Sequence, residues 1–536
     1  MPDEANSEAK QGKATAGRGV LYIAFAKFYF LFAGMAVTFK LPNILSRAEF
    51  GRFSLVNYIV SWFNNVAVTG TIQSVSRYSA QEPDKARLVQ AAGLRMHVRI
   101  GLPIAIAFIA AGPLVARYVL EDASKTAPLM LAGCILGIYS FYAVFIGTAN
   151  GTHAFHKQAG LDITSATLRV IGLLGTAMAG LGVVGVISGW VAASLLVFSV
   201  SILWVGLPRT GGERLPVAPM AKFFGGVAIY LLLFNGLMFV DTILLGRLTT
   251  QHFAAHADAM SAAIAHVLPW APGATGYHAE PSTLGDVQVA YYSAVQNLAR
   301  VSYQAIIAAT FVVFPLVSRS TFTDEKDTTK KYIEVTLRYS LMFAMAIAVV
   351  MIAKPADVMG VLYQADFAAI GGPALGVLAL GNVAFAMFAI AGTILNGAGQ
   401  SRPAIASAAI TLALAIVGNY IAITMYAGSA DLLLVVASVT SAAMAVGALI
   451  SGWQLRRAFG ATLPLLSVVR IAGAAAIAYV VGRVLPLHGK LMTLVAAALI
   501  AGTFLVLLVA SRELDKRDLD AIKAVRRKRA PGGEAA

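Results

Sequence analysis

The strongest constraint on this chain is a succession of long apolar stretches. Fourteen runs of 18 or more mostly apolar residues, bounded by charge, proline or glycine, follow one another between about residue 20 and residue 511. A helix needs about 20 such residues to cross the hydrocarbon core of a bilayer. Only 12% of the 536 residues are charged, and no polar segment is long enough for a separate core. The sequence therefore predicts an all-α polytopic membrane protein with about 14 transmembrane helices.

The predicted spans form two groups of six and a final pair. The first group lies near 20–41, 53–75, 98–119, 127–149, 161–182 and 184–206, the second near 223–246, 288–317, 333–353, 367–395, 403–427 and 431–452, and the pair near 466–486 and 491–511. This predicts an N-terminal tail (1–19), an N-lobe (20–206), a linker (207–222), a C-lobe (223–452) with an insertion (247–287), two further helices (453–511) and a basic tail (512–536).

Lysine and arginine set the expected orientation. With a cytoplasmic N-terminus, 29 of the 41 Lys and Arg belong to inner segments and 9 to outer ones. The positive-inside rule then predicts cytoplasmic termini and a periplasmic insertion 247–287. The net charge of +15 is mostly this topology signal, so we expect no nucleic-acid partner.

An internal repeat links the two groups of six. Aromatic-Ser-apolar-Val occurs at 53–56 and 292–295, and Asn-Gly ends the fourth span at 150–151 and the tenth at 396–397. The intervals from serine to asparagine are 96 and 103 residues. Both lobes start on the same side of the membrane, so we expect parallel repeats with a substrate path between them.

Three cations lie deep within predicted spans: Lys27, Arg169 and Arg300. Each costs at least about 2.5–3.5 kcal/mol in a bilayer centre, so each should face a partner or a water-filled cavity. The candidate partner is Asp241, and a structural pair of Asp241 with Arg300 or Lys27 stays an alternative. One aspartate cannot neutralise three cations, so the cavity should suit an anionic substrate.

Two further residues join this candidate substrate site. Asn297 lies three residues before Arg300 and shares a helix face with it. Arg52 opens the second span, where it either lines the outer mouth or anchors the helix at the interface. The remaining buried amides are best explained by hydrogen bonds between helices: Asn64, Asn65, Asn235, Asn382 and Asn419.

Signatures of catalysis and cofactors are missing. The chain has no phosphate-binding Gly-x-x-x-x-Gly-Lys-Ser/Thr loop, and its one cysteine, Cys134, excludes disulfides and cysteine-based metal sites. His252, His256, His266 and His278 of the insertion have no third ligand at a fixed spacing, so we expect no metal site. We expect no cofactor, with H⁺ or Na⁺ coupling through Asp241. Residues 512–529 predict a basic amphipathic helix on membrane lipids.

Several short motifs resemble a known family. They are Glu49-Phe50-Gly51-Arg52-Phe53-Ser54, Asp241-Thr242-Ile243-Leu244-Leu245-Gly246, Tyr291-Tyr292-Ser293-Ala294-Val295-Gln296, Phe314-Pro315-Leu316-Val317-Ser318-Arg319 and Leu395-Asn396-Gly397-Ala398-Gly399. With the helix pattern over 20–511, the chain resembles the polysaccharide-biosynthesis (Wzx-type) flippases of the multidrug/oligosaccharidyl-lipid/polysaccharide (MOP) exporter superfamily.

The resemblance implies a MATE-like fold in the bacterial inner membrane, with two six-helix lobes and two extra helices. It implies a secondary transporter, not an enzyme, that flips an undecaprenyl-diphosphate-linked oligosaccharide. In such flippases cations on the first and eighth helices receive the diphosphate, and Lys27 and Arg300 match those positions. A polysaccharide polymerase and a chain-length regulator are candidate protein partners.

Three alternatives stay open. A lipid II flippase shares the fold and differs in substrate. An integral-membrane polysaccharide polymerase or ligase acts on the same lipids, but the six-helix repeat argues against it. A MATE drug exporter is disfavoured because its substrates are commonly cationic.

Overall fold

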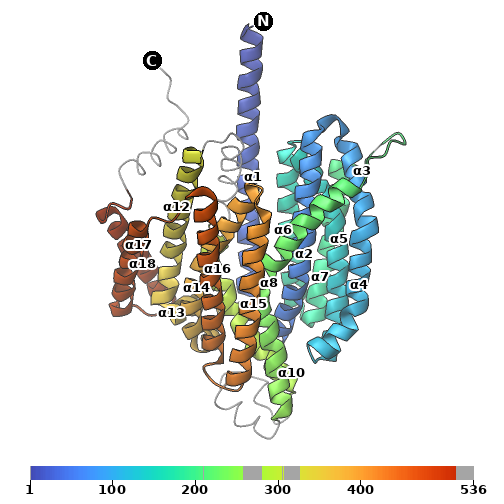
Figure 1. Cartoon of the computed structure of the whole chain (residues 1–536). Helices are drawn as coiled ribbons and strands as arrows, with labels where there is room; N and C mark the ends of the chain where they lie inside the picture. The colour runs from blue at the N-terminus through green and yellow to red at the C-terminus, as the bar shows by residue number, and fades with distance from the viewer. Residues whose placement is uncertain (1, 209, 257–279, 305, 307–325, 515–536) are drawn as a thin grey trace. The chain divides into compact units, whose positions relative to one another are not determined.

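The computed structural model in Figure 1 describes residues 2–208, 210–256, 280–304, 306 and 326–514. All regular secondary structure in these ranges is helical, which confirms the predicted all-α class. Eleven helices of the described residues are long and apolar enough to cross a membrane. By their internal contacts the residues group into two compact units, one of residues 1–293 with 412–432 and one of residues 294–411 with 433–536. The bounds of the predicted lobes stay a prediction.

The first unit is a bundle built around α2. Its helices are α1 (Pro2–Ile44), α2 (Arg47–Gln81), α3 (Ala86–Met96), α4 (Leu102–Leu114), α5 (Thr126–Gly151), α6 (Phe155–Met178), α7 (Gly182–Val205), α8 (Ala218–Ala255) and the start of α10 (Pro281–Ala299). The π-helices η2 (His97–Gly101) and η3 (Val115–Val119) extend α3 and α4 into one long span, Pro83–Val119. Helix α2 packs on α5 and α8, and α6 packs on α1 and α7.

The second unit contains α12 (Lys326–Ala353), α13 (Pro355–Leu362), α14 (Ala365–Gly397), α15 (Ser401–Tyr426, shared with the first unit), α16 (Leu432–Phe459), α17 (Leu465–Val484) and α18 (Lys490–Ala510). Helices α17 and α18 form an antiparallel pair that packs on α12. Buried Glu513, just after α18, forms ion pairs with Arg338 of α12 and Arg470 of α17 at 3.6 and 3.4 Å. This contact fixes the final helix pair to the unit.

Each of the fourteen predicted spans coincides with a helix, the eighth only at its start. The helices that fall outside the hydropathy criterion are α1, α2 and α10. Helix α2 carries Asn64 and Asn65 within its span. The end of the predicted eighth span and most of the basic helix 512–529 lie outside the described residues, as do the two histidines His266 and His278 of the insertion.

Helices α2 and α8 run antiparallel over most of their lengths. Residue numbers rise along α2 as they fall along α8, through the contacts Leu55–Gly246, Tyr58–Phe239, Asn65–Asn235, Gly70–Phe224 and Ser74–Met220. The amide pair is the hydrogen bond between helices that the sequence predicts, with Asn65 Nδ2 donating to Asn235 Oδ1 at 3.1 Å. A capping box of Ser46 and Glu49 starts α2.

Gly51 permits the closest approach in this bundle. A Cβ at residue 51 would overlap the backbone carbonyl of Asp286 at the start of α10, whereas a Cβ at Gly34 of α1 would meet nothing within 4 Å. Backbone cannot move aside as a flexible side chain can. We therefore expect Gly51→Ala to destabilise the protein by roughly 1–3 kcal/mol and Gly34→Ala to be neutral or stabilising by about 0.5–1 kcal/mol. Thermal unfolding in detergent checks both, and equal melting temperatures for the two variants would contradict this close contact.

Candidate functional site

The deepest cation of α1 has an acidic partner on α6. Lys27 Nζ lies 2.8 Å from Asp162 Oδ2, with side chains 46% and 12% exposed. The sequence suggested Asp241 as the partner because the fifth span was expected to begin at residue 161, which left Asp162 at a membrane surface. Helix α6 instead begins at Phe155, so Asp162 lies two turns inside it. The partner of Lys27 is therefore Asp162 of α6 and not Asp241 of α8.

Arg169 lies two turns further along α6, on the same face as Asp162. Its guanidinium carbon lies 4.3 Å from the centre of the Trp190 ring on α7. Arg169 Nε and Trp190 Nε1 are both buried, and neither has a hydrogen-bond acceptor in the described part of the chain. No carboxylate within those residues forms an ion pair with Arg169. Two buried donors thus lack a hydrogen-bond acceptor. An anionic ligand would supply that acceptor.

Hydroxyl groups surround these charged side chains. Tyr29 contacts the Thr167 hydroxyl at 2.8 Å, and Thr167 donates its own proton to Ile163 O, so Tyr29 is the donor. On α5, Tyr139 contacts Ser165 at 3.4 Å, and Tyr142 donates to Leu161 O. We call Lys27, Tyr29, Tyr139, Asp162, Ser165, Thr167, Arg169 and Trp190 the α1/α6 polar cluster. Its polar groups are mainly donors and hydroxyls, with the single acid already paired to Lys27.

Asp241 lies on α8, away from this cluster in sequence and in its contacts. The carboxylate is 1% exposed; Oδ1 accepts from the backbone N–H of Thr242 at 2.7 Å, and Oδ2 accepts from the Tyr292 hydroxyl of α10 at 2.9 Å. The predicted coupling role of Asp241 stays a prediction.

Arg300 and Asn297 belong to the second unit. Arg300 is 9% exposed and donates from NH2 to Gln296 Oε1 at 2.7 Å, one turn earlier. Tyr303 of the same segment packs edge-on against Phe385 of α14, with ring centres 4.8 Å apart. Arg300 is therefore a buried cation with a neutral amide among its hydrogen-bond partners. Its role, and that of Asn297, stay predictions.

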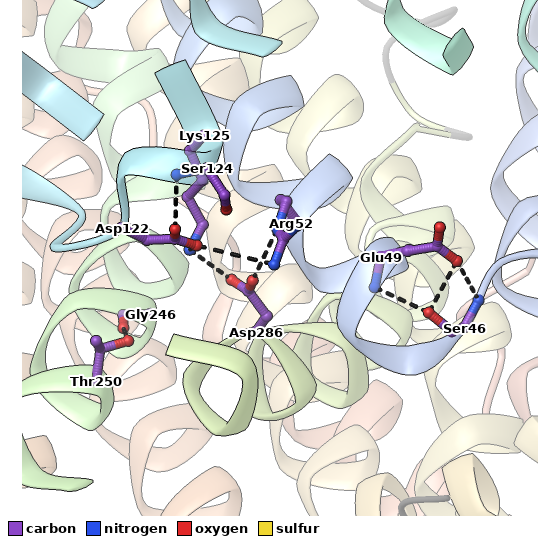
Figure 2. A network of polar contacts seen from close by, with 9 residues as sticks. All are labelled: Ser46, Glu49, Arg52, Asp122, Ser124, Lys125, Gly246, Thr250 and Asp286. Atoms are coloured by element: carbon purple, nitrogen blue, oxygen red, sulfur yellow. Dashed lines mark hydrogen bonds and ion pairs between the residues drawn. The ribbon is translucent and has the colours of Figure 1, made fainter. Parts of the chain in front are cut away.

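Arg52 takes part in a four-residue ion cluster, shown in Figure 2. Lys125 Nζ lies 2.8 Å from Asp122 Oδ2 and 2.9 Å from Asp286 Oδ1, and Arg52 Nε lies 3.3 Å from Asp286 Oδ2. Lys125 and Asp286 are each 1% exposed. The cluster joins α2, the connection before α5 and the start of α10, and its formal charges cancel. Arg52, which the sequence placed either at the outer mouth or as an anchor at the interface, thus pairs with two carboxylates.

The two acids of the ion cluster differ in their ease of ionisation. Burial opposes the charge on Asp122, but the Lys125 ammonium and the Ser124 hydrogen bonds outweigh it and hold the pKa of Asp122 below its usual range. Burial raises the pKa of Asp286 above its usual range, against the opposing effect of Lys125 and Arg52. Asp286 therefore depends on both cations for its charge.

The sequence gives only weak signals for several of these residues. Lys125, Asp122 and Asp286 read as ordinary loop charges, since their burial depends on segments that are distant in the chain. Asp162 was not assigned because His156, Lys157 and Gln158 separate Phe155 from the apolar run of the fifth span, which hid the true start of the helix. Tyr292 was part of the repeat motif without an assigned role. In the described residues, no group of three metal-ligating side chains occurs.

Comparison with known proteins finds one matching family and several solved structures of similar architecture. Residues 41–264 match the family model described as "Polysaccharide biosynthesis protein". A search of curated protein sequences found no match. Among solved structures, the chain is similar to the lipid II flippase MurJ in its inward closed conformation, with a TM-score of 0.68, 12% identity, and coverage of 92% of this chain and 99% of that one.

Two further similar structures are a multidrug resistance MATE family transporter of the MOP superfamily in inward-facing and outward-facing conformations. Their TM-scores are 0.60 and 0.58, each at 13% identity over 82% of this chain, covering 98% and 96% of those chains. The MATE-like fold predicted from the sequence is confirmed. The chain has the fold of these MurJ and MATE structures, and its residues 41–264 resemble a family of polysaccharide biosynthesis proteins, as the sequence motifs indicated.

Proposed function

We propose that this chain is a flippase that moves an undecaprenyl-diphosphate-linked oligosaccharide across the bacterial inner membrane by alternating access. The product would serve O-antigen, capsule or exopolysaccharide biosynthesis. The family match and the fold support this. The observation that carries it is the pair of buried donors without acceptors, Arg169 Nε and Trp190 Nε1. A planar guanidinium fixed against an aromatic ring can hold a phosphate oxygen through directed, charge-assisted hydrogen bonds.

Lys27 is the second proposed contact to the diphosphate. Its half-exposed ammonium is held by Asp162 until a stronger anion competes for it. We also propose Arg300 and Asn297 as substrate contacts, as the sequence predicts. Arg52 is occupied by Asp122 and Asp286, so we propose that it reaches substrate only in a state in which the ion cluster has opened.

We expect Lys27→Ala to lower transport roughly tenfold without lowering the amount of protein, because one charge-assisted hydrogen bond is lost. Asp162→Asn should have the opposite effect on binding, since it frees Lys27 for the diphosphate. Binding of the labelled lipid to purified protein checks both changes. Lys40→Ala, at an exposed lysine of the same helix, is the control. If Lys27→Ala binds and transports like Lys40→Ala, Lys27 is not a substrate contact.

The lipid II flippase is the second candidate function, because the fold similarity covers 99% of that flippase. Deleting the gene in its host separates the two. The proposed function predicts viable cells that lose surface polysaccharide and accumulate lipid-linked oligosaccharide, with recovery on expression of the chain. A lipid II flippase without a redundant partner predicts lysis. Intact surface polysaccharide in the deletion strain would contradict the proposal.

The proposal also covers the energy source, the membrane topology and the partners of the chain. We propose coupling to an H⁺ or Na⁺ gradient through Asp241, with no cofactor. We also propose cytoplasmic termini, contact of the basic tail with membrane lipids, and a polysaccharide polymerase and a chain-length regulator as partners. Asp241→Asn should abolish the dependence of flipping on an imposed ion gradient and leave substrate binding measurable. Gradient-dependent flipping at the wild-type rate would remove Asp241 from the mechanism.

A further inference from the structure

A buried histidine interrupts the third span. His97 is 2% exposed and begins the π-helix η2, between α3 and α4. π-helical turns are rare and are frequently found at functional sites. Gly101, one turn later, makes room for the imidazole, since a Cβ there would overlap His97 Nδ1. The helix is thus distorted and thinned around a titratable side chain that the proposed function does not use.

The hydrogen bonds show which ring nitrogen of His97 carries the proton. Thr71 of α2 has one hydroxyl proton, and it donates that proton to Ala67 O at 2.6 Å. Its contact with His97 Nε2 at 2.8 Å must therefore be a bond that His97 donates. Neutral His97 then carries its proton on Nε2 and a free lone pair on Nδ1. Nδ1 is buried and has no hydrogen-bond partner within the described residues.

The other groups around the ring are apolar. Phe141 of α5 and Phe224 of α8 lie edge-on at 6.0 and 6.2 Å between ring centres. Helix α5 carries no charged residue. The nearby cations make other contacts: Arg77 of α2 stacks on Phe223, Arg95 of α3 donates to Leu215 O, and Arg99 and Lys222 are exposed. None of these cations is hydrogen-bonded to His97, and no acid in the described ranges forms an ion pair with it.

A proton on Nδ1 is therefore incompatible with this packing. It would create a buried, charged N–H donor facing phenylalanine side chains, with no acceptor. Separation of α8 from α2 would relieve this conflict, because it removes Phe224 from the His97 ring and admits water. The contacts beside His97 at this end are Gly70–Phe224 and Ser74–Met220.

We propose that His97 is a proton-binding site whose occupation separates α8 from α2 at the end marked by Ser74 and Met220. The packed arrangement binds no proton at Nδ1, and the separated arrangement does. Packing is therefore favoured at high pH and lost as the pH falls below about 6.5, the ordinary histidine value. The inference goes beyond the proposed function, because the site is defined by the protein alone and is independent of the lipid carried.

Thiol cross-linking across α2 and α8 tests the linkage without any transport assay. Ser74→Cys and Met220→Cys are introduced together with Cys134→Ala, which removes the one native cysteine. Each pH unit below about 6.5 should reduce the packed fraction by up to tenfold, so between pH 8 and pH 5.5 cross-linking should slow by up to about tenfold more than protonation of the thiols alone slows it.

Two histidine variants of this cross-linking protein complete the test. His97→Gln, which keeps an N–H donor for Thr71 but takes up no proton, should remove the pH dependence beyond that of the thiols themselves. His156→Gln, at an exposed histidine, should retain it. The same pH profile with and without the His97→Gln substitution would overturn the proposal.

A second measurement needs no change at residue 97. Linkage is reciprocal, so locking α2 to α8 must suppress protonation of His97. Histidine ring-nitrogen NMR on the Ser74→Cys/Met220→Cys protein should show one histidine that titrates between pH 5 and 8 when the thiols are reduced and stops titrating when they are cross-linked. Identical titration of all histidines in the two forms would overturn the proposal even if His97→Gln fails to fold.

Discussion

Arg169→Ala should lower transport roughly 10- to 100-fold, the effect of losing one charge-assisted hydrogen bond of about 1.5–3 kcal/mol to a diphosphate. It should leave stability nearly unchanged. The substitution removes a buried charge that has no ion-pair partner in the described chain, and this relief offsets the lost stacking on Trp190 at 4.3 Å. A large loss of transport together with unchanged melting is the expected signature of a binding residue.

Two variants sharpen this test. Trp190→Phe keeps a ring under the guanidinium and removes only the unpartnered Nε1 donor, so it should reduce lipid binding by a few-fold without loss of stability. Arg117→Ala is the matched control, since Arg117 also stacks on an aromatic ring, Tyr118, but is exposed. Transport rates per folded protein in vesicles and melting in detergent measure the two effects. If Arg169→Ala unfolds the protein and binding of the lipid per folded molecule is normal, Arg169 is structural.

Lys125→Met should produce the largest loss of stability, about 3–5 kcal/mol, as expected when one partner of a buried ion pair is removed. Lys125 is 1% exposed and contacts two carboxylates, Asp122 at 2.8 Å and Asp286 at 2.9 Å. Without it, both acids depend on Arg52. Because burial already raises the pKa of Asp286, that acid should take up a proton, and the remaining stability should increase as the pH is lowered through its pKa.

The control for Lys125 is Lys85→Met, whose pair with Glu82 is about half exposed on both sides and should contribute little. Adding Asp286→Asn to Lys125→Met removes one of the uncompensated charges and should recover part of the loss. Melting temperatures in detergent at pH 5 and 8 measure these effects. Equal melting of Lys125→Met and Lys85→Met would contradict the buried ion cluster.

The helices of this fold follow from the sequence because each span is long and apolar on its own. Helical class and approximate span count therefore required no knowledge of contacts, whereas the MATE-like fold was implied by the resemblance of short motifs to a known family. The ends of the helices were harder to predict from the sequence, because a helix continues beyond its apolar run wherever packing covers polar residues. Helix α6 begins six residues before the predicted span, and α8 continues nine residues past residue 246.

The partners of the site residues could not be derived in the same way. Depth alone marks Lys27 and Arg169 as unusual, but the pairing of Lys27 with Asp162 joins residues 135 positions apart. The burial of Lys125 likewise depends on Asp286, which is remote in sequence. His97 carries no sequence signal, since its isolation results from the π-turn and from two phenylalanines on other helices.

The most direct measurement is translocation by the purified chain in vesicles. An undecaprenyl-diphosphate-linked oligosaccharide with a labelled terminal sugar is placed in the inner leaflet, and its arrival outside is followed by a glycosidase that cannot enter. We expect faster transfer with the wild-type chain than in protein-free vesicles, and near-background transfer with Arg169→Ala. The wild-type chain should transfer lipid II more slowly than the oligosaccharide lipid. Transfer no faster than in protein-free vesicles, with the chain folded and an ion gradient imposed, would contradict the proposed function, as would equal transfer by wild type and Arg169→Ala.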